Sequence, residues 1–162
     1  MKDKEFITYI LYSQIMVYEK DCKNPGLQWT DDHVKQGFAY TEKSVAFWIP
    51  DHDWECLVKV QEVERDIKID ENILWWISVP FFVATWSLAI STVMWEELFF
   101  EINKWQYQLI FTWEYDQSRE KAFILNFYFL RKNAGDFKIL KSCSIEGAST
   151  IDTILLTTSK EA

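Results

Sequence analysis

Histidine and glycine are scarce in this sequence, and their scarcity removes several kinds of chemistry. The 162 residues include two histidines and four glycines. Histidine is the usual acid–base residue near neutral pH and a common metal ligand, so few catalytic or metal-binding sets can form. The glycines form neither a G-x-G-x-x-G motif nor a P-loop, and no G-x-S-x-G nucleophile motif occurs. The sequence therefore carries no recognisable signature of nucleotide binding or hydrolysis.

Cysteine is also sparse, and its arrangement bears on the compartment. Cys22, Cys56 and Cys143 are odd in number, widely spaced and not arranged as C-x-x-C. This pattern indicates free thiols in a reducing environment. The N-terminus leads directly into a strand-like run, without an apolar signal segment. We therefore expect a cytoplasmic protein.

Basic residues are too few for a protein that binds nucleic acid directly. The chain has 17 Lys and Arg against 25 Asp and Glu, which gives a net charge of −8. Direct affinity for nucleic acid comes largely from Lys and Arg on phosphates. The acidic excess lies in the middle of the chain, where residues 31–120 hold 17 acidic and 7 basic side chains. Such a surface attracts basic partners and speeds encounter with them.

One long stretch lacks charge altogether. Ile73–Trp95 runs 23 residues without a charged side chain, which is long enough to cross a bilayer. Pro80, five serines and threonines, and acidic residues on both flanks argue against a membrane helix. We instead expect no membrane span and two buried strands joined by a turn near Thr85–Ser87, with Pro80 at a bulge or a sheet edge.

Aromatic residues, in contrast, are abundant and follow a strand period. They form 17% of the chain. In Tyr107–Tyr115 the odd positions are all aromatic or leucine, while the even positions are Gln, Ile, Thr and Glu. A period of two predicts a strand with one buried and one solvated face. Similar runs recur with short connections, so we predict an all-β antiparallel β-sandwich of about eight strands, in a single domain over residues 1–162.

One short helix is expected near residues 30–37. Thr30 or Asp31 can cap its start, and Gly37 can end it. Three apolar side chains are expected to close one end of the sandwich: Trp29, Val34 and Phe38. Three polar side chains are expected on the surface, available to a partner: Asp31, Asp32 and Gln36.

The titratable clusters do not add up to a catalytic or metal site. Asp51, His52, Asp53 and Glu55 could in principle offer metal ligands, but neighbouring strand residues point to opposite faces and no second His or Cys cluster completes a set. Cys56, followed by Leu57, is typical of a buried structural thiol. We therefore predict no metal and no cofactor.

A pair of carboxylates could also serve a glycosidase, and Glu96, Glu97 and Glu101 are close in sequence. A charged outer face of a strand explains the same spacing. We predict that the protein is not an enzyme and has no catalytic residues.

The helical segment also carries a family resemblance. Trp29–Ala39 reads W-T-D-D-H-V-K-Q-G-F-A and follows a strand over Tyr9–Tyr18. Together with Ser78–Phe81, Ile90–Ile102 and Tyr107–Leu109, it resembles the competence protein J family across roughly residues 6 to 130. That family is typified by the cytoplasmic inhibitor of the DNA-entry nuclease of transformable bacilli. The charged stretch from Asp51 to Glu71 and the tail after Lys132 look longer than expected for the family.

The resemblance implies a small β-sandwich that binds and blocks a nuclease, as a competence-nuclease inhibitor or as an immunity protein against a nuclease toxin. A nuclease holds a polyanion in a basic cleft, so carboxylates around aromatic anchors suit an inhibitor. The predicted partner-binding residues are Asp31, Asp32, Asp51, Asp53, Trp54, Glu55, Glu96, Glu97 and Glu101. The alternatives are a small-molecule or carbohydrate-binding sandwich that uses exposed tryptophans and, third, a hydrolase using Glu96 and Glu101.

Overall fold

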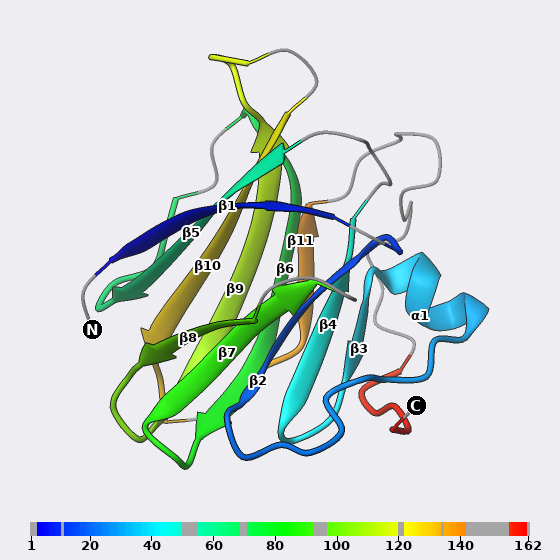
Figure 1. Cartoon of the computed structure of the whole chain (residues 1–162), viewed down its shortest axis with the longest axis vertical. Helices are drawn as coiled ribbons and strands as arrows, with labels where there is room; N and C mark the ends of the chain where they lie inside the picture. Colours follow the sequence, from blue (N-terminus) through cyan, green and yellow to red (C-terminus); the bar gives the residue numbers. More distant parts are fainter. Residues whose placement is uncertain are drawn as a thin grey trace.

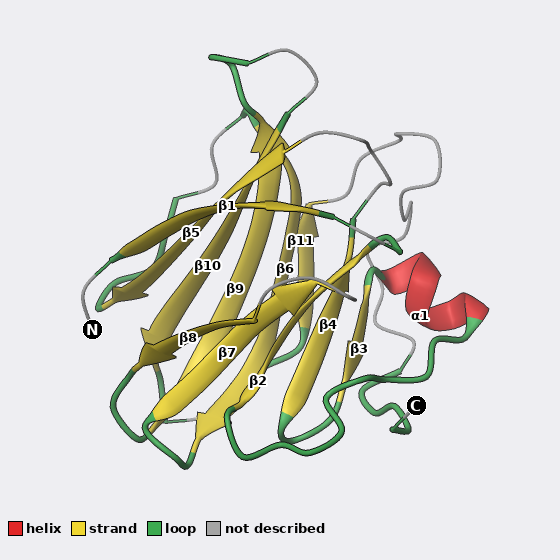
Figure 2. Cartoon of the chain, in the orientation of Figure 1, coloured by secondary structure: helices red, strands yellow, loops and turns green. Residues whose placement is uncertain are grey.

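Two β-sheets pack face to face, with one short helix beside them (Figures 1 and 2). The computed structural model describes residues 3–10, 12–49, 55–68, 71–92, 97–119, 122–133, 135–141 and 156–161. Helix α1 spans Asp31–Gln36. The prediction of an all-β sandwich with one short helix near residues 30–37 is confirmed.

The sheets differ in size. The six-stranded sheet has, in spatial order, β1 (Lys4–Tyr9), β5 (Glu55–Val63), β10 (Phe123–Arg131), β9 (Trp105–Tyr115), β6 (Ile73–Val83) and β11 (Lys138–Lys141). The five-stranded sheet has, in order, β3 (Phe38–Tyr40), β4 (Ser44–Trp48), β2 (Gln14–Glu19), β7 (Ser87–Thr92) and β8 (Glu97–Glu101). Every described pairing is antiparallel except that of β5 with β10.

The described residues form eleven strands rather than about eight, partly because an apparently continuous run is broken. The sequence suggests a single strand over about Phe6–Glu19, which includes the Tyr9–Tyr18 run, whereas β1 and β2 belong to different sheets. Between them Tyr12 and Ser13 have φ of 56° and 55°. Two consecutive left-handed residues turn the chain sharply, and neither is the glycine that normally marks such a turn.

The uncharged run after Ile73 forms the two predicted strands, β6 and β7. They are not hairpin partners, because the turn at Trp86 (φ 66°) carries the chain from one sheet to the other. Pro80 lies in β6 beyond Ser78, the last residue that β11 pairs, as expected for a proline near a sheet edge. Among the described residues, the helical content is too short and too polar to cross a membrane.

A buried carboxylate stabilises the turn that carries the chain from β6 in one sheet to β7 in the other. Glu19, at the end of β2, is 2% exposed. Its carboxylate accepts hydrogen bonds from the backbone N–H groups of Ala84 and Thr85 and from the Thr85 hydroxyl. These bonds offset the cost of burying the charge and fix where β6 ends and β7 begins.

The core lies between the inner faces and is rich in aromatic rings. The ring of Phe47 in β4 stacks on Phe111 in β9 at 4.5 Å between centroids, and Phe127 in β10 completes the group. The alternation in β9 predicts that Gln108 and Ile110 lie on a solvated face. The structure shows that both are buried. Ile110 packs in a second cluster on the outer face of the six-stranded sheet, beneath the segment that contains Ile67.

Candidate functional site

Helix α1 places two predicted partner-binding residues on the surface. The Thr30 hydroxyl accepts a hydrogen bond from the His33 N–H, and the Thr30 N–H donates to His33 Nδ1, so the two residues cap the helix reciprocally. Gly37 ends the helix with φ of 86°, as predicted. Asp31 and Asp32 are exposed in the first turn, where the helix dipole favours negative charge.

The buried side of α1 differs from the prediction. Gln36, expected on the surface, is 0% exposed. Its Nε2 donates to the carbonyls of Phe38 and Leu156, and its Oε1 accepts from the Leu156 N–H. Val34, expected to help close the sandwich, is 37% exposed, whereas Phe38 is buried as predicted. Helix α1 therefore turns Gln36 toward the C-terminal segment, and Val34 toward solvent.

The C-terminal segment lies against this helix (Figure 1). His33 Nε2 is 3.1 Å from the Thr158 carbonyl oxygen. Since Nδ1 accepts from Thr30, Nε2 carries the hydrogen and donates to Thr158. The segment continues along the strand-like connection before the helix, where the Gln28 N–H donates to the Lys160 carbonyl. The polar side chains of α1 thus anchor the end of the chain rather than form an acid–base site.

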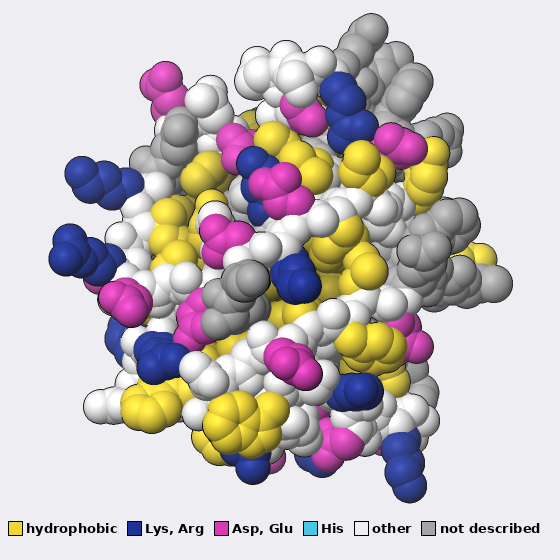
Figure 3. All heavy atoms as spheres, turned by 60° about the vertical axis from the view of Figure 1, so that its left-hand side comes forward, with side chains coloured by type: hydrophobic (Ala, Val, Ile, Leu, Met, Phe, Trp, Pro, Cys, Tyr) yellow, Lys and Arg dark blue, Asp and Glu magenta, His cyan; other side chains and the backbone are white. Residues whose placement is uncertain are grey.

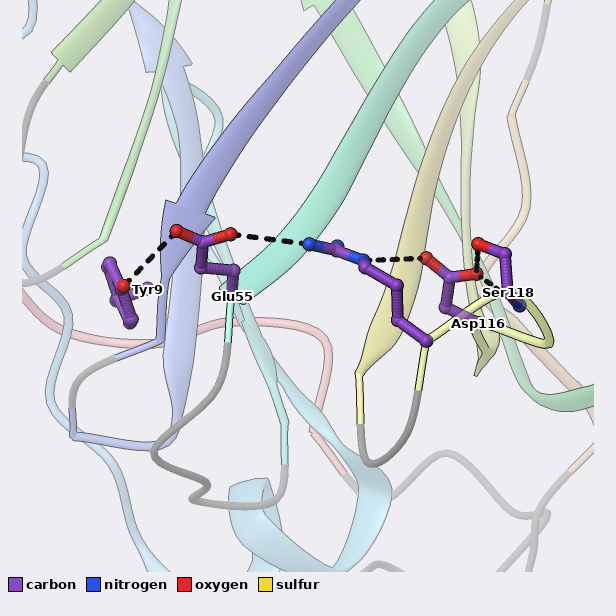
Figure 4. Close-up of polar contacts among 5 residues, drawn as sticks. Tyr9, Glu55, Asp116 and Ser118 are labelled. Atoms are coloured by element: carbon purple, nitrogen blue, oxygen red, sulfur yellow. Dashed lines mark hydrogen bonds and ion pairs between the residues drawn. The ribbon is translucent and has the colours of Figure 1, made fainter.

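Glu55, another predicted partner-binding residue, belongs to a network at the start of β5 (Figure 4). Its carboxylate accepts from the Tyr9 hydroxyl and pairs with Arg119 at 3.2 Å. Arg119 also pairs with Asp116, whose carboxylate accepts from Ser118. The Ser118 hydrogen bond, followed by the Ser118 backbone and Arg119, lowers the pKa of Asp116. The network ties the edge strand β1 to the β9–β10 connection.

Strand β8 presents a row of alternating side chains on the outer face of the five-stranded sheet. Glu97, Phe99 and Glu101 are exposed, while Phe100 between them packs into the core. The Tyr18 hydroxyl donates to the Glu97 carboxylate at 2.6 Å. Burial, and then this hydrogen bond, raise the pKa of Tyr18 to about 12, so the phenol remains a donor across the physiological range.

A groove lies beside this row. It encloses about 860 Å³ and is lined by Trp86, Phe99, Ile102 and several charged residues, Lys4 and Lys20 among them. Trp86 is 53% exposed and Phe99 is 52% exposed. Figure 3 shows this side of the molecule, where hydrophobic side chains emerge between charges of both signs. Large exposed aromatics beside a groove are typical of a site that a partner covers.

The described acidic candidates occupy three separate regions. Asp31 and Asp32 lie on α1, next to β3, at one edge of the five-stranded sheet, and Glu97 and Glu101 lie on β8 at its other edge. Glu55 lies in the other sheet. The remaining candidates lie outside the described residues: Asp51, Asp53, Trp54 and Glu96. Sequence reasoning missed Trp86 and Phe99, although the spacing of Glu97, Phe99 and Glu101 already placed the three on one face.

The remaining chemical candidates among the described residues are not arranged as a reactive centre. Cys56 is 0% exposed, as predicted for a buried thiol, and burial raises its pKa to about 12. A protonated thiol is a poor nucleophile. Within the described part of the chain, no three His, Cys, Asp or Glu side chains gather as metal ligands would.

Comparison with known proteins identifies the family. The family model for competence protein J (ComJ) matches residues 7–130. The chain belongs to the competence protein J family. The DNA-entry nuclease inhibitor of Bacillus subtilis (strain 168) is 27% identical to it over 101 residues, which cover 62% of this chain and 74% of that protein.

One solved structure supports the fold. The crystal structure of ComJ from Bacillus subtilis, described as an inhibitor of the DNA-degrading activity of NucA, has a TM-score of 0.65 at 22% identity, covering 82% of this chain and 96% of that one. The product of crocagin biosynthetic gene J gives a TM-score of 0.47 at 11% identity, covering 79% and 98% of the two chains, which is too low to support an argument.

The ComJ match contains α1, β8 and every residue that lines the groove except Lys4, but it ends before the C-terminal segment. Beyond residue 130, β11 pairs with β6, and Phe137 stacks on Phe38 of β3 at 6.0 Å between ring centroids. These additions cover the side of the sandwich where β3 lies. The groove beside β8 lies on the other side, and all its lining residues apart from Lys4 belong to the part of the chain that the ComJ family model matches.

Proposed function

We propose that this chain is a protein inhibitor of a nuclease. The observation that carries the proposal is its membership of the ComJ family together with its similarity to a DNA-entry nuclease inhibitor. The proposed role is binding rather than catalysis. Two observations support that role: Cys56 is buried, and both ring nitrogens of His33 are hydrogen-bonded within the protein, to Thr30 and Thr158.

The inhibitor would compete with nucleic acid through carboxylates that surround aromatic anchors. A nuclease cleft holds phosphates with basic residues, so a carboxylate row is attracted to it and repels DNA or RNA. Among the described candidates, Glu97 and Glu101 fit this role best, because they flank Phe99 beside a groove. Glu55 is already paired with Arg119, which leaves less of its charge to a partner.

The partner is accordingly a cognate nuclease or the nuclease domain of a toxin, met in the cytoplasm, and direct binding to nucleic acid is not part of the mechanism. A competence-nuclease inhibitor and a toxin immunity protein would use the same interaction. They differ only in where the nuclease comes from. The net charge of −8 supports both, since it steers a basic enzyme toward the inhibitor.

The test combines capture with inhibition. Tagged protein is used to capture partners from the source cell, and purified protein is titrated into NucA of Bacillus subtilis and into each captured nuclease, with DNA and RNA as substrates. We expect one nuclease to be inhibited as a complex forms, with association slowing in high salt, since the screening length falls from about 10 Å at 0.1 M to about 3 Å at 1 M.

Charge-matched variants show where the partner binds. Glu101→Arg should slow association, whereas Glu42→Arg, which makes the same charge change in the exposed turn between β3 and β4, should not. Capture of no nuclease, together with direct binding of DNA or of a carbohydrate, would refute the proposal.

A further inference from the structure

Strand β8 ends the five-stranded sheet, and within the described residues its outer edge pairs with no other strand. The opposite edge is different, because β3 follows directly after α1 and its Phe38 stacks on Phe137. An unpaired edge presents backbone N–H and C=O groups that another strand can bind. The outer edge of β8, next to the groove, can therefore pair with an added strand.

The hydrogen-bond register shows which residues present those groups. The Ile102 N–H donates to the Trp86 carbonyl, so Trp86 and Ile102 form a hydrogen-bonded pair. In an antiparallel ladder such pairs alternate with pairs that are not hydrogen-bonded. From Ile102 back along β8, every second residue is therefore hydrogen-bonded to β7. The residues between them are Glu97, Phe99 and Glu101, and their backbone N–H and C=O groups point away from β7.

The same three residues also project their side chains to the outer face. Their neighbours in β7 are Ser91, Ala89 and Ser87, which are small. The small neighbours leave room for the Phe99 ring to lie over the sheet, where Lys20 sits 5.4 Å from its centroid. A strand added to β8 would therefore meet, on one face, the sequence carboxylate, aromatic ring, carboxylate.

The edge lacks three of the features that commonly prevent pairing, namely proline, lysine and a bulge. β8 reads Glu-Leu-Phe-Phe-Glu, and its register with β7 is regular over all five residues. Its two carboxylates do, however, select against a second copy of the chain. If two β8 strands paired antiparallel about Phe99, Glu97 of each would face Glu101 of the other, and like charges directly opposite one another are destabilising.

From these observations we propose that β8 binds an extended segment of a partner protein as an added strand, and that this segment alternates basic, apolar and basic side chains. The apolar residue would lie beside Phe99, and the two Lys or Arg side chains beside Glu97 and Glu101. Main-chain hydrogen bonds supply the attachment, and the alternation supplies the specificity. The identity of the partner rests on the proposed function, whereas the binding mode does not.

Two short peptides test the binding mode directly. Isotope-labelled full-length protein is titrated with a capped peptide of sequence Thr-Lys-Thr-Val-Thr-Lys-Thr and, separately, with the same peptide carrying Glu in place of Lys. We expect the Lys peptide to shift the backbone amide signals of Glu97, Phe99 and Glu101 and to slow their hydrogen exchange. The Glu peptide should bind at least about tenfold more weakly, because two cross-strand charge pairs change sign.

A pair of substitutions at one position separates the backbone contribution from the side chain. Phe99→Pro removes an N–H that points to the open edge and leaves the β7 pairing intact, as proline is tolerated there. Phe99→Ala removes the ring alone. We expect Phe99→Pro to abolish binding of the Lys peptide and Phe99→Ala to weaken it only severalfold. Circular dichroism serves as the check that both variants fold.

Three results would overturn the proposal: no β8 amide shift with the Lys peptide at millimolar concentration, equal binding of the two peptides, or equal binding by the two variants. Concentration-dependent dimers held through β8 would also overturn it, because a second copy would then be the occupant. If the protein inhibits a nuclease but the peptide does not bind, the binding mode alone fails. If the Lys peptide binds β8 but no nuclease is inhibited, the nuclease function alone fails.

Discussion

Replacing Gln36 should loosen the C-terminal segment and lower the stability of the whole protein. The side chain is fully buried and makes at least three hydrogen bonds to described residues, two of them to the backbone of Leu156. Each such bond contributes about 1 kcal/mol net, so Gln36→Ala should cost about 3 kcal/mol. For a protein of this size that corresponds to a fall in Tm of about 6–12 °C.

Thermal unfolding and hydrogen exchange measure the two parts of this effect. The Leu156 amide donates to Gln36 Oε1 in the parent, so its exchange should accelerate at least about tenfold in the variant. Lys35→Ala is the matched control, because Lys35 is exposed on the same helix and makes only a weak ion pair with Asp32 at 3.9 Å. A Tm for Gln36→Ala close to that of the control would refute the role assigned to this side chain.

Three further predictions concern stability and the groove. Gly37→Ala should destabilise by about 2–4 kcal/mol in denaturant titrations, since φ is 86° and the new Cβ would lie 2.6 Å from Trp75 Cζ2. Asp116→Asn should make the free energy of unfolding depend less steeply on pH in the acid range. The lowered pKa of Asp116 contributes stability above about pH 4, and this stability is lost as the pH falls through the folded-state value, so parent and variant should diverge above that range and converge below it. Trp86→Gly should leave Tm unchanged or raise it, because glycine relieves the φ of 66°, yet weaken nuclease capture, and unchanged capture would exclude Trp86 from the interface.

The sequence predicts elements whose causes are local. The cap at Thr30, the helix end at Gly37 and the buried odd positions of β9 depend on neighbouring residues. The cap and the helix end are confirmed, and the odd positions of β9 are buried from Tyr107 to Trp113, whereas Tyr115 is exposed. The burial of Gln108 and Ile110 depends on residues from elsewhere in the chain that cover the outer face, so alternation alone could not predict it.

The errors in the predicted site also arise from contacts between residues that are distant in the sequence. Gln36 looked like a surface residue because its partner, Leu156, is 120 positions away. The acidic excess of residues 31–120 predicted a charged region without predicting its geometry, and the topology sends Asp31 and Glu101 to opposite edges of one sheet. Edge position, which decides what β8 can bind, is a property of strand order that composition does not encode.

The parallel pairing of β5 with β10 has a consequence for biosynthesis. Cys56 lies beside Phe123, so β5 has only β1 as a neighbour until more than sixty further residues have left the ribosome. Contacts this distant in sequence slow folding and leave strands exposed in the meantime. A nascent chain interrupted before Phe123 would display β5 with one open edge. We therefore expect truncated products to aggregate or to need a chaperone, and the proposed inhibition of a nuclease to lag synthesis of the chain.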